Sequence, residues 1–135
     1  MAIEGVVYLT YAEAVALHIE LMRFVGETRY GVFDRTLVES ALSRPRQAAV
    51  YDDADISIQA ATLCFGLIKN HPWHGGNKRT ATFLTDRFLR TNGYRISARA
   101  AEFIGMVLAV EAGKWTIEQV ADWMRAHIRE TTDAA

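Results

Sequence analysis

One ten-residue stretch concentrates the residue types that catalyse reactions or bind anions: His71-Pro72-Trp73-His74-Gly75-Gly76-Asn77-Lys78-Arg79-Thr80. It lies between an apolar run over residues 56–68 and a segment with helical spacing over residues 80–89, which predicts a turn between two helices. The paired glycines free the backbone for conformations that residues with a Cβ resist, and Asn77 is suited to cap the helix that follows. The unpaired N–H groups and the positive dipole at such a helix start favour an anion.

The two cations after the glycine pair strengthen the case for an anion site. Lys78 and Arg79 in a first helical turn oppose the helix dipole, at a cost of about 0.3–1 kcal/mol each. A bound phosphate would account for that arrangement. The alternative is an ordinary glycine turn followed by two solvated side chains, because such turns are common before helices.

The composition is that of an ordinary globular protein and predicts a single domain over residues 1–135. Half of the residues are apolar and the formal net charge is −1, so the chain as a whole does not attract nucleic acid or a membrane surface electrostatically. The sequence shows neither a signal peptide nor a membrane-spanning run. We therefore expect a cytoplasmic protein that contacts neither nucleic acid nor membrane directly.

Two residues outside the ten-residue stretch have reactive side chains but are interpreted as structural. The single cysteine, Cys64, lies in an apolar run and is expected to be buried, because a reactive thiolate needs an electropositive, partly exposed setting. His18 lies on a predicted helix, where a lone histidine is more often packed or solvated than a ligand.

The sequence before the ten-residue stretch predicts two further helices. Residues 10–13 form a capping box that starts the first helix. Asp34 caps a short second helix that runs to Ser43 and ends at Pro45, since the residue before a proline is biased away from helical geometry. Residues 44–55 are then expected to be irregular, either a connecting loop or a short hairpin flap over the site.

The rest of the chain completes an all-α bundle of about six helices. The third helix, over residues 56–68, is apolar on nearly all sides and should lie at the centre. The fourth ends at Asn92-Gly93, and residues 94–96 form a short extended bridge. Ser97 is expected to cap the fifth helix, and a capping box at Thr116 to start the sixth.

The ten-residue stretch resembles the signature of the Fic/Doc superfamily, His-x-Phe-x-Asp/Glu-Gly-Asn-x-Arg. Its form from Asn77 to Thr80 is similar to the Doc (death-on-curing) toxin branch, with Lys78 where Fic enzymes have glycine. The similarity extends back through residues 31–51 and covers most of the chain up to about Tyr94. It implies the compact Fic-fold helical bundle.

The resemblance also implies roles for the residues of the stretch. His71 would be the general base that activates a target hydroxyl, and histidine is the side chain that most often takes this role in enzymes. Lys78 and Arg79 would stabilise the phosphates of a nucleoside triphosphate, with ATP expected, as further catalytic residues. His74 is either a phosphate contact or an exposed loop residue. The nucleotide-binding residues would be Gly75, Gly76, Asn77, Lys78, Arg79 and His74.

Gly75 departs from the family, because the acid that coordinates magnesium stands at this position in other members. Three outcomes follow for Mg²⁺. The nucleotide could hold the metal by itself, the enzyme could be weak or inactive, or a nearby acid could substitute. The acids considered are Asp52, Asp53 and Asp55. Trp73, which replaces the family's phenylalanine, is expected to plug the core beneath the loop.

Three functions remain open from the sequence. The first is a Doc-like toxin that transfers a phosphoryl group to a protein Ser/Thr hydroxyl, with a translation elongation factor as the target that the resemblance implies. The alternatives are a Fic-type nucleotidyl (AMP) transferase and a degenerate, non-catalytic module that binds a nucleotide or a partner. The chain contains no inhibitory Ser/Thr-x-x-x-Glu-Gly/Asn segment, as is typical of Doc, so a Phd-like antitoxin would act in trans by helix-in-groove binding.

Overall fold

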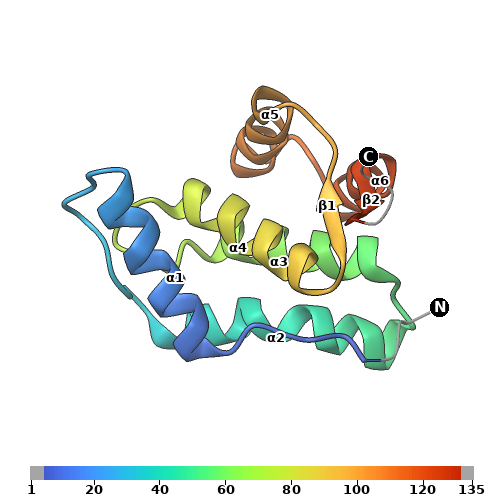
Figure 1. Cartoon of the computed structure of the whole chain (residues 1–135), viewed down its shortest axis with the longest axis horizontal. Coiled ribbons are helices and arrows are strands. Elements are labelled where there is room, and N and C mark those ends of the chain that lie inside the picture. Colours follow the sequence, from blue (N-terminus) through green and yellow to red (C-terminus); the bar gives the residue numbers. More distant parts are fainter. Residues whose placement is uncertain (1–4, 132–135) are drawn as a thin grey trace.

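Six α-helices and one pair of short strands make up residues 5–131, the part of the chain that the computed structural model describes. Along the chain (Figure 1) they are α1 (Tyr11–Phe24), α2 (Arg35–Asp52), α3 (Ile56–Asn70), α4 (Asn77–Thr91), β1 (Tyr94–Ile96), α5 (Ala100–Glu111), α6 (Ile117–His127) and β2 (Ile128–Glu130). The predicted all-α bundle of about six helices is confirmed.

Helix α3 forms the centre of the bundle. It packs against α2, α4, α5 and α6, and the α3–α4 pair lies between α2 on one side and α5 and α6 on the other (Figure 1). Apolar residues surround α3, so side chains such as Leu63, Cys64 and Leu67 are buried. Burial raises the pKa of the Cys64 thiol to about 12, and its structural interpretation is confirmed.

The helix starts at α1, α2 and α6 lie where the sequence predicted them. Thr10 and Glu13 form a reciprocal capping box on α1, and Thr116 and Gln119 form another on α6. The Asp34 carboxylate caps α2. Each of these hydrogen bonds spans only three residues, so the local sequence is enough to predict it.

Helix α2 differs from the prediction because it does not end at Pro45. It continues well beyond Ser43, so residues 44–55 contain its whole second half and form no hairpin flap. A proline in a helix interior forfeits one backbone hydrogen bond and costs about 3 kcal/mol. Pro45 is buried, however, and Gly66 of α3 leaves room for α2 to approach closely. Packing on α3 therefore outweighs the local effect of the proline.

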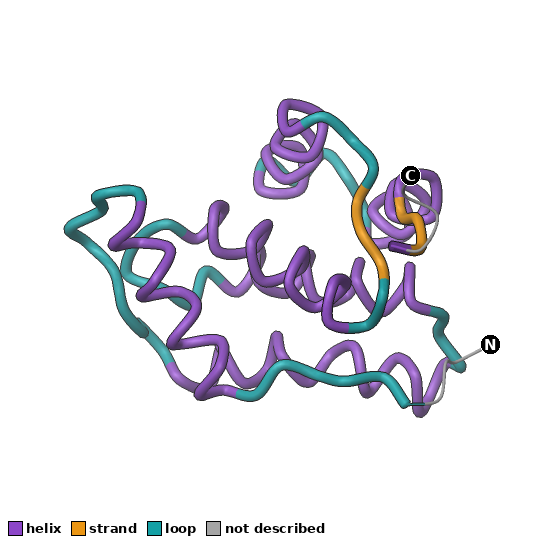
Figure 2. The backbone as a smooth tube through the Cα atoms, in the orientation of Figure 1, coloured by secondary structure: helices purple, strands orange, loops and turns teal. Residues whose placement is uncertain are grey.

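The two short strands tie residues 128–130 to the connection before α5 (Figure 2). Residues 94–96 are extended, as expected, but their antiparallel pairing with β2 was not predicted. The pairing continues as the Ser97 N–H donates to the His127 carbonyl at 2.7 Å. Ser97 is thus engaged in this connection, and the N-cap of α5 is Arg99 instead of Ser97.

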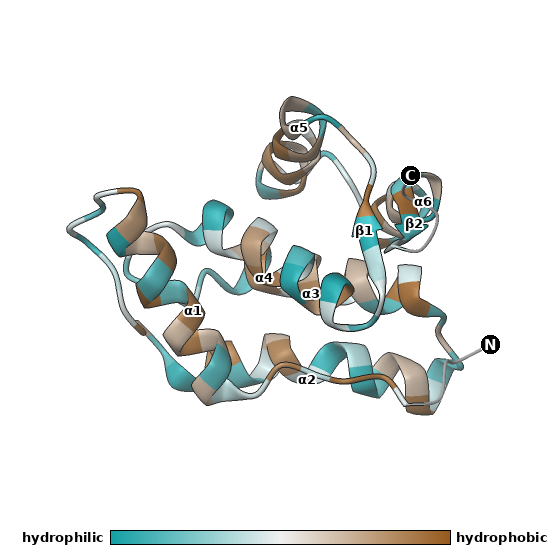
Figure 3. Cartoon of the chain, viewed as in Figure 1, coloured by the Kyte–Doolittle hydropathy of each residue, from teal (hydrophilic) through white to brown (hydrophobic). Residues whose placement is uncertain are grey.

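Helix α5 carries apolar residues on its packed face and on its exposed face (Figure 3). Met106 and Val110 are buried in the core, whereas Ile104 is 52% and Leu108 is 47% exposed. Within residues 5–131, no helix is both long and apolar enough to cross a membrane.

Candidate active site

The loop that joins α3 to α4, residues 71–76, is called the signature loop below. It turns on two residues in the left-handed backbone region: His71 ends α3 with φ 51° and ψ 53°, and Gly76 precedes α4 with φ 67°. The left-handed conformation at Gly76 favours glycine, and a Cβ there would also displace the end of the Met22 side chain. The predicted glycine turn before a helix is confirmed.

Asn77 is the first residue of α4 and not its N-cap, which corrects the prediction; Gly76 holds the cap position. The buried Asn77 side chain folds back on the signature loop. Its Oδ1 accepts from the Trp73 N–H at 3.0 Å and its Nδ2 donates to the Trp73 carbonyl at 2.9 Å. The backbone of Trp73 thus satisfies both the oxygen and the nitrogen of the Asn77 side-chain amide. These two hydrogen bonds hold the signature loop against the start of α4.

Trp73 plugs the core beneath the loop, as predicted: it is 2% exposed. Its ring stacks on His18 of α1 with ring centroids 4.1 Å apart. The His18 Nε2 accepts from the Gly31 N–H at 3.0 Å, so the ring proton lies on Nδ1, which is 2.8 Å from the Thr80 Oγ1. Burial lowers the pKa of His18 to about 4. Its structural interpretation is confirmed, and of the two alternatives, packed or solvated, it is packed.

The connection between α1 and α2, residues 25–34, lies along the signature loop and is called the covering segment. Its residues pair with residues 72–74 as a short extended bridge, in which the Gly31 carbonyl accepts from the His74 N–H at 2.9 Å. From the sequence, such a cover was one of two alternatives for residues 44–55, the other being a connecting loop, but these residues lie in and after α2. The glycines of the covering segment were a signal for a turn, but nothing in them specified which loop they would contact.

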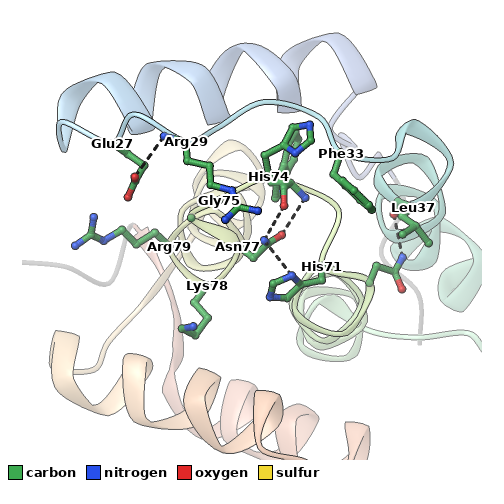
Figure 4. Close-up of a pocket in the computed structure, with 13 residues that line it drawn as sticks. Glu27, Arg29, Phe33, Leu37, His71, His74, Gly75, Asn77, Lys78 and Arg79 are labelled. Atoms are coloured by element: carbon green, nitrogen blue, oxygen red, sulfur yellow. Dashed lines mark hydrogen bonds between the residues drawn. The ribbon is translucent and has the colours of Figure 1, made fainter.

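A cavity of about 690 Å³ opens between the covering segment, the signature loop and the start of α4 (Figure 4). It brings together all of the predicted site residues: His71, His74, Gly75, Gly76, Asn77, Lys78 and Arg79. Glu27, Arg29 and Phe33 of the covering segment line it as well, although the sequence did not single them out. The predicted residues therefore share one cavity, but their roles in it stay predictions.

Arg29, Lys78 and Arg79 give the cavity its positive charge, and they differ in their partners. The Lys78 Nζ lies 3.1 Å from the Glu111 Oε2 of α5 and points away from Arg29 (Figure 4). Within residues 5–131, neither the Arg29 nor the Arg79 guanidinium forms an ion pair. Two of the three cations are therefore available to an anion.

His71 presents its side chain at the mouth of the cavity, 61% exposed. Its Nδ1 lies 3.3 Å from the Asn77 Nδ2. Because the Trp73 N–H fixes which end of the Asn77 amide is the oxygen, this contact makes Nδ1 the acceptor and leaves the ring proton on Nε2. The Nε2 faces the Glu111 Oε2 at 3.9 Å. Sequence reasoning missed Glu111 because only the packing of α5 beside α4 brings it here.

The acids proposed as substitute metal ligands lie at the wrong end of the bundle. Asp55 caps the first turn of α3, whereas His71 ends that helix. At 1.5 Å per residue, the 15-residue helix puts about 22 Å between them. Asp52 and Asp53 are at the end of α2, near Asp55, and none of the three lines the cavity. Of the three outcomes considered for Mg²⁺, substitution by one of these acids therefore has no support in their positions.

The residues present do not fit the family's magnesium site. A Cβ at Gly75 would overlap the Arg29 carbonyl oxygen, so an acidic side chain has no room at the position where the family carries one. Within residues 5–131, no three His, Cys, Asp or Glu side chains gather as a metal site would require. One carboxylate, Glu27, lines the cavity, and its Oε1 already accepts the N–H groups of Thr28 and Arg29.

Comparison with known proteins agrees with this geometry. The model of the Fic/DOC family matches residues 8–89, which is more than half of the chain and includes the whole signature loop. The chain is also 26% identical over 120 residues to the "Protein kinase doc" of Escherichia phage P1, covering 87% of this chain and 93% of that protein. Both findings support the resemblance to the Doc branch. The signature loop, the residues that line the cavity and the start of α4 all fall inside the matched region. The chain is a helical bundle that belongs to the Fic/DOC family.

Proposed function

We propose that this protein is a Doc-like toxin that acts in the cytoplasm and transfers a phosphoryl group from a nucleoside triphosphate to a protein Ser/Thr hydroxyl. The observation that supports this best is a single cavity in which His71 lies beside Lys78 and Arg79 at the start of α4. The name of the phage relative, a protein kinase, agrees with phosphoryl transfer. The resemblance to Doc adds a translation elongation factor as the target class.

In the proposed reaction, His71 takes the proton of the target hydroxyl as its oxygen attacks the γ-phosphorus. The bond from the γ-phosphorus to the oxygen that bridges it to the β-phosphate breaks, and the nucleoside diphosphate leaves. Arg79 and the free N–H groups at the start of α4 bind the phosphate oxygens and stabilise the charge that develops on them. Lys78 joins them when it exchanges the Glu111 carboxylate for a phosphate oxygen.

The surroundings of His71 suit a proton acceptor. In the neutral ring the lone pair is on Nδ1, where the only contact within residues 5–131 is the long one to Asn77. After proton uptake, the imidazolium would face the Glu111 carboxylate through Nε2. Glu111 would therefore act on two groups of the site, the base and Lys78.

Two other functions could use the same cavity. A nucleotidyl (AMP) transferase would bind the triphosphate in the reverse direction and attack the α-phosphorus. A non-catalytic module would bind the nucleotide without turnover, and Gly75 is the residue that favours this alternative, since it removes the family's metal ligand.

Labelled ATP separates the three functions. The protein is incubated with cell lysate and with ATP carrying label at either the α- or the γ-phosphate, and we expect protein-bound label from γ only. Label from α would identify nucleotidyl transfer, and no label from either would identify a binding module. His71→Ala should abolish the labelling and relieve growth inhibition on expression, while nucleotide binding and thermal stability stay near wild type because the side chain is exposed. Loss of binding in this variant would contradict its role as the base.

A groove beside the cavity supports the second part of the proposal, a Phd-like antitoxin in trans. It measures about 300 Å³ and is lined by Lys78, Arg79, Thr82, Ile104, Val107 and Leu108. Its apolar wall on α5 suits the apolar face of a partner helix, and its basic end suits acidic residues. A helix seated there would lie beside the phosphate-binding cations, which explains how binding would block the site.

A further inference from the structure

We propose that Arg29 takes the place of the metal ion in this site, so that the cavity binds a triphosphate without a divalent cation. This inference rests on the proposed function, since it assumes that a nucleotide occupies the cavity. Three observations lead to it: the closed position at Gly75, the anchoring of the covering segment, and the lack of ion pairs at Arg29 and Arg79 within residues 5–131.

Arg29, the residue that we propose in place of the metal ion, also blocks residue 75, where the family carries its metal-binding acid. The Arg29 carbonyl oxygen occupies the space into which a Cβ at residue 75 would project. Glycine at this position therefore lets the covering segment lie directly on the signature loop. That approach places the Arg29 side chain at the start of α4, where it reaches toward Gly75 and Asn77 (Figure 4). The absence of a side chain at residue 75 and the position of Arg29 over the loop are therefore parts of one arrangement.

The backbone that carries Arg29 is held on both sides. The Glu27 Oε1 accepts the N–H groups of Thr28 and Arg29 at 3.2 Å and 3.4 Å. Two residues further on, the Gly31 N–H donates to the buried His18, and the Gly31 carbonyl accepts from His74. An arginine on an anchored segment loses less conformational freedom when it binds than one on a loose loop.

The charges around the cavity favour an anion over a cation. Three cations and one carboxylate, Glu27, line it, and a second carboxylate, Glu111, pairs with Lys78 beside it. Guanidinium groups bind phosphate through two parallel N–H donors, and Arg29 and Arg79 both lack a competing carboxylate within residues 5–131. A divalent metal would have to share the phosphate oxygens with these cations and would meet no cluster of acids. Arg29 is thus a nucleotide-binding residue that sets the metal requirement of the site.

Direct binding measurements test the inference. ATP is titrated into the full chain by calorimetry, once with EDTA and once with Mg²⁺. We expect wild-type affinity in EDTA to equal or exceed that in Mg²⁺. Arg29→Gln should weaken binding in EDTA by about tenfold or more, because a charge-assisted bidentate contact is lost. Arg87→Gln is the matched control, since this α4 arginine does not line the cavity, and it should bind as wild type does.

The outcomes separate this inference from the proposed function. If wild type binds only with Mg²⁺ and Arg29→Gln equals Arg87→Gln, the inference is overturned while nucleotide binding stands. If wild type binds ATP under neither condition, the proposed function fails and the inference with it. Gly75→Asp provides a second variant: it should not create Mg²⁺-dependent binding, because the Arg29 carbonyl blocks the new side chain. A gain of Mg²⁺ dependence in that variant would also overturn the inference.

Discussion

At the scale of single residues, His18 holds together the parts that form the cavity. It stacks on Trp73 of the signature loop, accepts from Gly31 of the covering segment and contacts Thr80 of α4. These contacts require a neutral ring, because a proton on Nε2 would face the Gly31 N–H. Burial supports the same state by lowering the pKa of His18 to about 4.

The His18 pKa predicts how stability depends on pH. The unfolded chain binds a proton at this residue below about pH 6.5, and the folded protein does so only below about pH 4. The free energy of unfolding should therefore fall as the pH drops through this window, with a slope that approaches about 1.4 kcal/mol per pH unit from this residue. Urea unfolding across the window measures it.

A pair of variants isolates the contribution of His18. His18→Gln should be less stable than wild type at neutral pH and should show a flatter pH dependence. His74→Gln is the control, because His74 is an exposed histidine on the same site, and it should keep the wild-type slope. Equal slopes for wild type and His18→Gln would contradict the assignment.

At the scale of elements, Asp55 stabilises two helices at once. It caps α3 by accepting the Ile58 N–H at 3.0 Å, and it pairs with Arg125 of α6 at 3.2 Å. Burial acts to raise the pKa of Asp55, but the hydrogen bonds from Ile58 and Arg125 outweigh it and keep the pKa below its usual value. The ionised carboxylate therefore stabilises the fold at neutral pH, and that stabilisation is lost as the pH falls through the lowered pKa.

Two substitutions of Asp55 separate the cap from the ion pair. Asp55→Ala removes both and should lower the free energy of unfolding by about 1–2 kcal/mol, the usual cost of a lost N-cap. Asp55→Asn keeps a capping oxygen and should cost at most about 1 kcal/mol, because an exposed ion pair contributes little. Chemical denaturation at neutral pH compares them. Equal losses would show that the ion pair with α6 stabilises the fold more than the cap does.

The helix starts and ends show where the local sequence is sufficient to predict the structure. The caps at Thr10, Asp34 and Thr116 were predicted because both partners of each hydrogen bond lie within one turn. The end of a helix at Pro45 was predicted on the same local basis and was wrong, because the buried face of α2 packs along α3. Local signals fail where a long-range contact contributes more free energy than they do.

At the scale of the whole molecule, the position of α5 beside α4 forms the proposed partner groove. Ile104 and Leu108 are exposed on α5 although both are large apolar residues. Because they lie beside the basic residues Lys78 and Arg79, we expect them to contact the proposed partner. Lys78 and Arg79 line both this groove and the cavity, so the two share side chains at their boundary. The same packing brings Glu111 to Lys78 and His71.

A carboxylate in this groove should therefore disrupt partner binding. Leu108→Glu is expected to weaken the complex with a purified Phd-like antitoxin by about tenfold or more, since a charge would be buried in an apolar contact. Val50→Glu is the matched control, because Val50 is an exposed apolar residue of α2 outside the groove. A titration by calorimetry measures both. An unchanged affinity for Leu108→Glu would place the antitoxin elsewhere.

The sequence by itself determined the helical class, the central position of α3, and the residues of the signature loop. These three features depend on the periodicity of apolar residues and on motifs that span only a few residues. Both can be read directly from the sequence. It also showed that residue 75 lacks the family's acid.

Only the tertiary structure decided what surrounds that loop. It showed that Arg29 and Glu27 lie on the covering segment over the cavity, that Glu111 reaches Lys78 from α5, and that Asp55 is a helix length away. Each of these depends on which elements pack together, and a free-energy balance summed over the entire core sets that packing.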